Sequence, residues 1–185
     1  RNGQDAAYYV FSDAEVAWLT AWLQSHDAVL GVREHMADTA RTYTRMLEPT
    51  GAIDLSGFVH PEVLYRVSSA LVTDYSSCFI DYMLTGKPAI SFAYDYASYA
   101  QVERGTFYDL DFVFPGRVCQ SFDELAGALD VLFEAPAESD RRLLEWKRRL
   151  FFDHVDDRSS ARVVERVKML ADFEDVGGRH YRIGV

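Results

Sequence analysis

Short apolar runs alternate with amphipathic helical patterns along most of this chain, from about residue 12 to residue 133. Runs of this length are typical of buried strands, and the patterns between them have the spacing of helices that pack on one face. We expect strands at 28–32, 52–55, 70–73, 89–93 and near Val118, and helices at 12–26, 38–48, 61–67, 76–84, 121–133, 138–150 and 159–173. Strands separated by helices pair in parallel, which predicts an α/β, Rossmann-like domain of three layers with a parallel sheet.

The helix ends are marked by residue types that cap helices. Ser12 with Glu15, and Ser121 with Glu124, have the spacing of a capping box, in which each side chain binds a backbone N–H at the helix start. Pro61 suits the first turn of a helix, and Gly86 suits a helix end. We also expect the last two helices to pack against the same core.

Length and charge limit the function classes. With 185 residues and 49% hydrophobic side chains, the chain predicts a single domain, 1–185. Its formal charge of −10 opposes general attraction to nucleic acid, so a phosphate ligand must be bound locally. Cys78 and Cys119 lack the spacing of a metal site, and we expect two free, buried thiols and no bound metal. The sequence lacks a long apolar run and starts abruptly at Arg1, so we expect a cytosolic fragment of a longer protein.

The most informative segment is LVTDYSSCFIDY, residues 71–82, followed by Gly-Lys-Pro at 86–88. A buried strand runs into a tight turn, and Ser76 and Ser77 then open a helix, where free amides favour an anion. Asp81 lies about one turn further along, within reach of a ribose hydroxyl. Ligands of open parallel sheets bind at the carboxyl ends of the strands, so this turn is a candidate nucleotide diphosphate site. The competing interpretation is that Asp74 and Ser76 only cap the helix.

An ordered set of motifs resembles the CDP-glycerol glycerophosphotransferase family of teichoic acid polymerases and primases. The set comprises Thr-Asp-Tyr-Ser-Ser at 73–77, Asp81, Gly-Lys-Pro-Ala-Ile at 86–90, Tyr94, Asp95 and Tyr99, Arg-Gly at 104–105, Phe-Tyr-Asp at 107–109, Pro-Gly at 115–116 and Asp-Glu-Leu at 123–125. The resemblance implies the carboxyl-terminal, donor-binding half of a GT-B fold. It also implies a bacterial transferase of cell wall or capsule phosphopolymers, with CDP-glycerol or another CDP-alditol as donor and a lipid-linked phosphopolymer as acceptor. Such an enzyme acts peripherally at the cytoplasmic side of the membrane and needs no cofactor.

The same resemblance suggests roles for individual residues. Arg33 and His35 occupy the place of the family's Arg-x-His-Pro motif and, with Ser76 and Ser77, are expected to bind the donor phosphates; Met36 replaces the proline. Arg104 is a further candidate phosphate ligand, and Asp81 resembles the ribose ligand of related enzymes. The general base is expected in an amino-terminal domain absent from this chain, so this fragment should bind donor without turning it over. Asp109-Leu110-Asp111 imitates a metal motif of another glycosyltransferase fold, and we discount a metal role.

Two alternatives stay open at this point. A GT-B glycosyltransferase or a UDP-GlcNAc 2-epimerase-like enzyme has a similar turn, although the epimerase pattern has glycines in place of Ser76 and Ser77. A non-catalytic nucleotide-binding module is the second alternative. The aromatic cluster between Tyr94 and Phe114 suits either cytosine stacking or core packing. The sequence does not distinguish glycerol, ribitol and sugar phosphate donors, or a primase from a polymerase.

Overall fold

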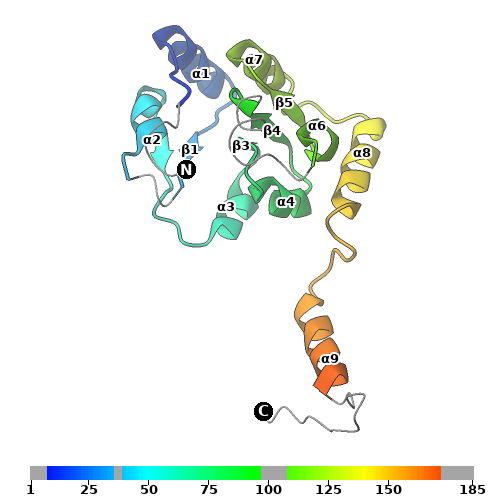
Figure 1. Ribbon diagram of the computed structural model, residues 1–185. Coiled ribbons are helices and arrows are strands. Elements are labelled where there is room, and N and C mark those ends of the chain that lie inside the picture. Colours follow the sequence, from blue (N-terminus) through cyan, green and yellow to red (C-terminus); the bar gives the residue numbers. More distant parts are fainter. Residues whose placement is uncertain (1–7, 36–38, 97–107, 172–185) are drawn as a thin grey trace.

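The computed structural model describes residues 8–35, 39–96 and 108–171 (Figure 1). Its helices are α1 (Asp13–Ser25), α2 (Thr42–Met46), α3 (Pro61–Val67), α4 (Cys78–Tyr82), α6 (Leu110–Val113), α7 (Phe122–Asp130), α8 (Glu138–Arg149) and α9 (Ser159–Ala171). Two short 3₁₀ helices, η1 (Glu48–Thr50) and η2 (Met83–Thr85), follow α2 and α4. The strands are β1 (Gly31–Val32), β2 (Ile53–Asp54), β3 (Leu71–Thr73), β4 (Ala89–Phe92) and β5 (Arg117–Cys119).

All described strand pairs are parallel, as the sequence predicted. β1 pairs with β2, and β4 lies between β3 and β5. The strands therefore form two hydrogen-bonded groups where we expected one continuous sheet, and several strands are shorter than their apolar runs. In β4 the register places Ser91 opposite Thr73 on one side and opposite Val118 on the other. The expected α/β fold class is confirmed.

Local sequence determines where several helices begin. Ser12 and Glu15 form the predicted capping box, with the Glu15 N–H donating to Ser12 Oγ and the Ser12 N–H donating to Glu15 Oε2. α3 begins at Pro61 as expected. At α7, Ser121 Oγ accepts the Glu124 N–H, but the Glu124 carboxylate binds the N–H of Gln120 rather than that of the cap residue. The second predicted capping box is therefore only half formed.

The core has two parts, on opposite faces of β4. Ile90 and Phe92 join α1 and α7 in a cluster that also contains Leu19, Trp22, Leu23, Cys119, Leu125 and Leu129. Ala89 joins the other cluster, formed by α4, η2 and α6, which contains Phe79, Tyr82, Met83, Leu110, Val113 and Phe114. Successive side chains of a strand point to opposite faces, so β4 is covered by helices on both sides. This arrangement gives the three expected layers (Figure 1).

Helices α8 and α9 behave differently. α8 packs on the core through partly buried Leu144 and buried Lys147, whose Nζ donates to the carbonyls of Asp111 and Phe114 at 3.2 and 2.6 Å. α9 extends away from the domain (Figure 1), and its Val163 and Val167 are exposed. The expectation that both final helices pack on the core is therefore wrong for α9. Its sequence is amphipathic, but the chain between α8 and α9 leads it off the surface.

The two cysteines are free thiols, but only one is buried as expected. Cys119 lies in the core at the end of β5, where burial raises the pKa of its thiol. Cys78 is only half-buried, because it begins α4 at the edge of the sheet, beside the exposed Ser76–Ser77 turn.

Candidate functional site

Polar side chains follow β1 and β3 directly at their carboxyl ends. Arg33, Glu34 and His35 come after β1, and the turn from Asp74 to Ser77 comes after β3. Ligands of parallel α/β folds bind at these ends, because the loops there are exposed and the helices that follow point their amino ends toward the same edge. The candidate site is therefore built from two segments that lie about forty residues apart in sequence.

Asp74 holds the Asp74–Ser77 turn in place through its side chain and its backbone carbonyl. Asp74 Oδ1 accepts the N–H of Ser76 at 2.7 Å, and the Asp74 carbonyl accepts from Ser91 Oγ at 3.0 Å. Ser91 is fully buried in β4, so the turn is pinned to the centre of the three-stranded sheet. Asp74 thus shapes the turn, but it does not cap α4 as the competing sequence interpretation proposed, since the residue before α4 is Ser77.

The serines of this turn do not cap α4 with their side chains. Ser77 is the residue that precedes α4, and its side chain makes no capping hydrogen bond. Ser76 and Ser77 are exposed, and within the described part of the chain neither hydroxyl has a hydrogen-bond partner. Two hydroxyls held on a pinned turn and left free are suited to bind a ligand.

The segment after β1 alternates between buried and exposed residues. Val32 and Glu34 are buried, whereas Arg33 and His35 are exposed. The Arg33 guanidinium donates a long hydrogen bond of 3.4 Å to the Phe58 carbonyl. Both predicted phosphate ligands of this segment therefore face away from the core. The convergence of His35 on the Ser76–Ser77 turn stays a prediction.

Tyr65 of α3 is a candidate site residue that was not predicted from the sequence. Burial raises the pKa of its phenol, nearby Cys78 and Asp81 raise it further, and Arg33 acts in the opposite direction. Charge effects of this kind weaken with distance, so each of these three residues lies near the Tyr65 phenol. Tyr65 thus has Arg33, from the β1 end, and Asp81, from α4, among its electrostatic neighbours. The helical spacing of α3 alone did not reveal which of its residues faces the strand ends.

The remaining predicted residues are Asp81, Arg104 and the Asp109-Leu110-Asp111 segment. Asp81 is exposed on α4, and Arg104 lies outside the described residues. Asp109 caps α6, accepting the N–H of Asp111 at 3.0 Å, which gives the Asp-Leu-Asp segment a local structural role. Within 8–35, 39–96 and 108–171, no group of three His, Cys, Asp or Glu residues is arranged to hold a metal ion.

Lys87 of the Gly-Lys-Pro motif stabilises the end of α3. Its Nζ donates to the carbonyls of Tyr65, Arg66 and Ser68 at 3.2, 2.6 and 2.6 Å. Carbonyls at a helix end lack partners within the helix and carry partial negative charge, so a cation is favourable there. Lys87 thereby fixes the helix that carries Tyr65.

Two aromatic residues after β4, Tyr94 and Phe114, belong to the core, whereas Tyr108 and Phe112 are more than half exposed. Tyr94 packs on Tyr9 and Phe92 with ring centroids 5.3 and 5.6 Å apart, and its hydroxyl lies 3.2 Å from that of Tyr43. Phe114 is fully buried. For Tyr94 and Phe114 the core-packing alternative holds.

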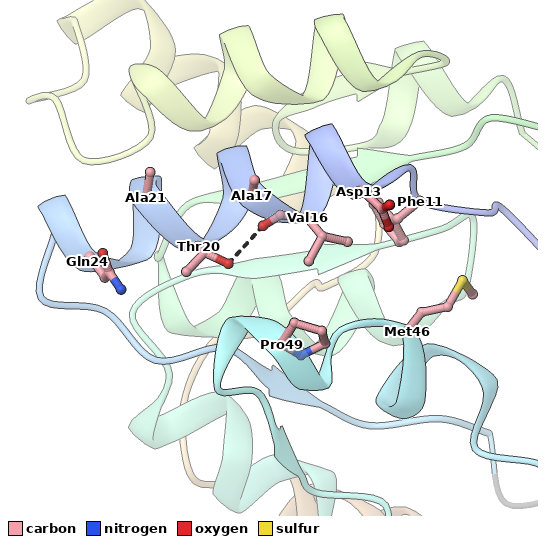
Figure 2. A pocket seen from close by; sticks show the side chains of 9 residues that line it. All are labelled: Phe11, Asp13, Val16, Ala17, Thr20, Ala21, Gln24, Met46 and Pro49. Carbon is pink, nitrogen blue, oxygen red and sulfur yellow. Dashed lines mark hydrogen bonds between the residues drawn. The ribbon is translucent and has the colours of Figure 1, made fainter.

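A separate groove of about 600 Å³ lies between α1 and the α2–η1 segment (Figure 2). Its lining is mostly apolar, with Val16, Ala17, Met46 and Pro49 among the side chains that face it. None of the predicted site residues lines this groove. The groove is thus separate from the candidate site, where Arg33, His35, Ser76 and Ser77 are exposed.

Comparison with known proteins gives a consistent result. The model of the family described as CDP-Glycerol:Poly(glycerophosphate) glycerophosphotransferase matches residues 1–169. The chain is 30% identical to the teichoic acid ribitol-phosphate polymerase TarK of Staphylococcus aureus over 130 residues, which are 70% of this chain and 25% of TarK. It is 32% identical to the teichoic acid poly(ribitol-phosphate) polymerase of Bacillus spizizenii over 124 residues, which are 66% of this chain and 19% of that protein. The chain thus spans about a quarter or less of these relatives.

Solved structures show the same fold. The wall teichoic acid polymerase TagF superposes with a TM-score of 0.61 at 24% identity, over 91% of this chain and 41% of the TagF chain. A TagF variant soaked with CDPG gives the same TM-score, identity and coverage. The similarity confirms the predicted fold, one half of a GT-B arrangement.

Proposed function

Because the chain belongs to the CDP-glycerol:poly(glycerophosphate) glycerophosphotransferase family, we propose that residues 1–185 form the donor-binding domain of an alditol-phosphate transferase. The donor is CDP-glycerol or a related CDP-alditol. The acceptor is a lipid-linked phosphopolymer of the teichoic acid or capsule type. One structural observation supports donor binding most directly: the pinned turn after β3 presents two serine hydroxyls, without hydrogen-bond partners among the described residues, at the ligand-binding edge of a parallel α/β fold.

Each side chain at this edge has a proposed role. Ser76 and Ser77 bind a pyrophosphate oxygen, and Arg33 and His35 neutralise its charge from the β1 end. Asp81 accepts a hydrogen bond from the ribose. Arg104, outside the described residues, is proposed to bind a phosphate of donor or acceptor. The formal charge of the chain is −10, which repels a phosphate. Attraction of the phosphate therefore depends mainly on these local cations and hydroxyls.

The proposed reaction is a displacement at phosphorus. A hydroxyl oxygen of the acceptor forms a bond to the phosphorus that carries the alditol, and the bond from that phosphorus to the bridging pyrophosphate oxygen breaks. CMP leaves with the electron pair of that bond, and the proton of the hydroxyl passes to a general base. Donor-site residues assist chiefly by positioning the phosphorus and by neutralising charge that moves onto the leaving phosphate.

The general base is proposed to lie in another domain of the full-length protein. The chain spans 41% of the superposed TagF chain, which leaves room for such a domain. We therefore expect residues 1–185 alone to bind donor without releasing CMP. No helix among the described residues is both long and apolar enough to cross a bilayer. We propose that the full-length protein acts at the cytoplasmic side of the membrane and associates with it peripherally.

Calorimetric titration of the chain with CDP-glycerol, CDP-ribitol, UDP-GlcNAc and CMP tests the proposal. A CDP-alditol should bind at least tenfold more tightly than CMP, because it carries a second phosphate for the Ser76–Ser77 turn, a difference of about 1.4 kcal/mol. The preferred alditol identifies the substrate. Preference for UDP-GlcNAc would favour the nucleotide-sugar enzymes instead. A full-length protein that binds donor but releases no CMP would favour a non-catalytic module.

A further inference from the structure

Glu34 is a buried acidic residue between the two exposed residues Arg33 and His35. Its side chain is only 6% exposed. In an extended segment, successive side chains point to opposite sides, so the side chains of Arg33 and His35 face outward as long as Glu34 faces inward. The contact that holds Glu34 inside therefore favours the outward direction of both neighbours.

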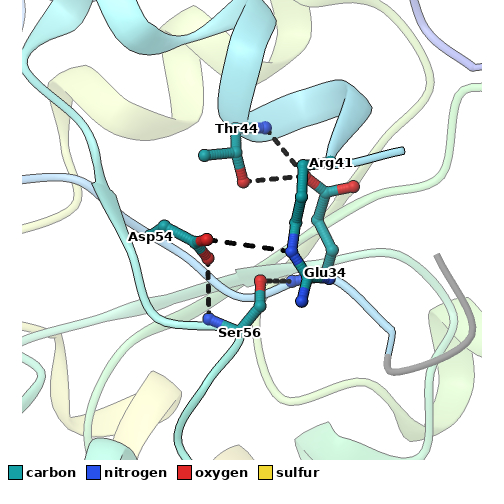
Figure 3. A network of polar contacts seen from close by, with 5 residues as sticks. All are labelled: Glu34, Arg41, Thr44, Asp54 and Ser56. Carbon is teal, nitrogen blue, oxygen red and sulfur yellow. Dashed lines mark hydrogen bonds and ion pairs between the residues drawn. The ribbon is translucent and has the colours of Figure 1, made fainter. Parts of the chain in front are cut away.

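The inward position of Glu34 is fixed by hydrogen bonds to two other elements (Figure 3). Glu34 Oε1 accepts from the Thr44 N–H at 2.8 Å and from Thr44 Oγ1 at 2.7 Å, which ties it to α2. The Glu34 N–H donates to Ser56 Oγ at 3.2 Å, just after β2. The Ser56 N–H in turn donates to Asp54 Oδ1 at 2.8 Å, and Asp54 Oδ2 lies 3.7 Å from Arg41 Nε at the start of α2. The segment after β1 is thus attached on two sides.

Burial of a carboxyl group is a poor way to stabilise a core. Removing it from water is unfavourable, and an apolar side chain of similar size is often as stabilising or more so. Here Glu34 Oε2 is buried and has no hydrogen-bond partner among the described residues. Glu34 instead fixes the orientation of its own side chain, because two hydrogen bonds from Thr44 reach the same carboxylate oxygen.

From this arrangement we infer that Glu34 is a positioning residue of the donor site, which orients Arg33 and His35 toward the donor phosphates through its attachment to Thr44. The inference rests on the proposed function of this edge. Glu34 itself touches no donor atom, since its carboxylate is buried against α2. Of the two carboxylate oxygens, Oε1 is the one that accepts from Thr44, so an amide oxygen can replace it.

Calorimetric titration with CDP-glycerol and with cytidine tests the inference. Glu34→Leu fills a similar volume but accepts no hydrogen bond, and it should weaken CDP-glycerol binding by about ten- to a hundredfold, the size of effect that loss of a residue orienting a metal ligand has on metal affinity. Cytidine has no phosphate, so its affinity should change less than twofold. Glu34→Gln keeps an oxygen that can accept from Thr44, so its CDP-glycerol affinity should stay within about threefold of wild type. A tenfold loss would correspond to about 1.4 kcal/mol, as much as a lost interaction.

Thr44, which holds the Glu34 carboxylate, allows a second test in which Glu34 itself is unchanged. Thr44→Val removes the hydroxyl donor and keeps the backbone N–H, so it should weaken CDP-glycerol binding in the same direction but less. Thr20→Val is the matched control, because the Thr20 hydroxyl also makes one hydrogen bond, 2.8 Å to the Val16 carbonyl, but within α1. Equal effects of the two threonine variants on CDP-glycerol binding would overturn the inference.

A mutant cycle separates positioning from general stability. If Glu34 acts through its neighbours, Glu34→Leu should add less than a twofold loss of CDP-glycerol affinity in a chain that already carries Arg33→Ala and His35→Ala. A full, additive loss, or an equal loss of cytidine affinity, would overturn the positioning role while leaving the proposed function intact. A wild-type chain that binds no CDP-glycerol would instead overturn the proposed function, and with it this inference.

Discussion

The double variant Ser76→Ala, Ser77→Ala, in the turn after β3, should change ligand affinity without changing the stability of the fold. Both residues are exposed, and neither hydroxyl is hydrogen-bonded within the described part of the chain. The turn itself is held by Asp74 and Ser91, which the change leaves intact. The free energy of unfolding should therefore change by less than about 0.5 kcal/mol, as for other surface substitutions away from structural contacts.

The expected loss of donor affinity follows from the charge of the phosphate. A hydrogen bond to a charged group contributes about 1.5–3 kcal/mol. Two are removed, but water and backbone amides at the helix start replace part of the interaction. We expect a combined loss of about 1.4–4.1 kcal/mol, which corresponds to a roughly ten- to thousandfold weaker CDP-glycerol complex.

The assay is calorimetric titration of the double variant with CDP-glycerol and with cytidine, together with a thermal melt. Cytidine affinity should stay at the wild-type value, since cytidine lacks phosphate. Asp81→Asn should weaken both ligands, because both contain the ribose. Ser160→Ala, on exposed helix α9, is the matched control for loss of a surface hydroxyl.

Three results would refute the reasoning in different ways. Unchanged CDP-glycerol affinity would show that the phosphates bind elsewhere. An equal loss for cytidine would place the nucleoside, rather than the pyrophosphate, on the Ser76–Ser77 turn. A large drop in melting temperature would show that the serine hydroxyls support the fold after all.

Further predictions concern parts of the chain that support the site. Lys87→Met should destabilise the domain by about 1.5–3 kcal/mol in a denaturant titration, because it removes a charged donor from the carbonyls that end α3. Gly116→Ala should cost about 1–3 kcal/mol or more in the same titration, since an added Cβ would overlap the Ala89 carbonyl. Hydrogen bonding to Arg162 lowers the Asp156 pKa from 3.8 to about 2, so its contribution to α9 should persist above pH 3.8 and be lost as pH falls toward 2. Circular dichroism should show this loss of helicity in the wild type and not in Asp156→Asn.

Much of the fold could be predicted from local sequence because the signals were local. Pro61 marked the start of α3, and Ser12 with Glu15 marked the start of α1 through hydrogen bonds that span one helical turn. The second predicted capping box was only half right, because the Glu124 carboxylate found the Gln120 N–H instead. That choice depends on the direction of the preceding strand, which local sequence does not specify.

The candidate site was predicted only in part. The turn carrying Ser76 and Ser77 could be located, since an apolar strand followed by small polar residues indicates a ligand edge, although β3 itself is only partly buried and not fully buried as expected. Tyr65 was missed, because its relation to Arg33 and Asp81 depends on where α3 packs. Local sequence indicated Lys87 only as part of the Gly-Lys-Pro motif, because the carbonyls that it binds lie about twenty residues earlier in the chain.

By itself the sequence determined the alternation of strands and helices, the parallel fold class and the family, because apolar periodicity, capping residues and ordered motifs are properties of neighbouring residues. Tertiary structure alone decided which side chains meet across the chain. It buried Glu34 against Thr44, pinned Asp74 to Ser91 and left α9 exposed, because each outcome depends on how separate elements pack, and packing is set by distances and directions that no local pattern contains.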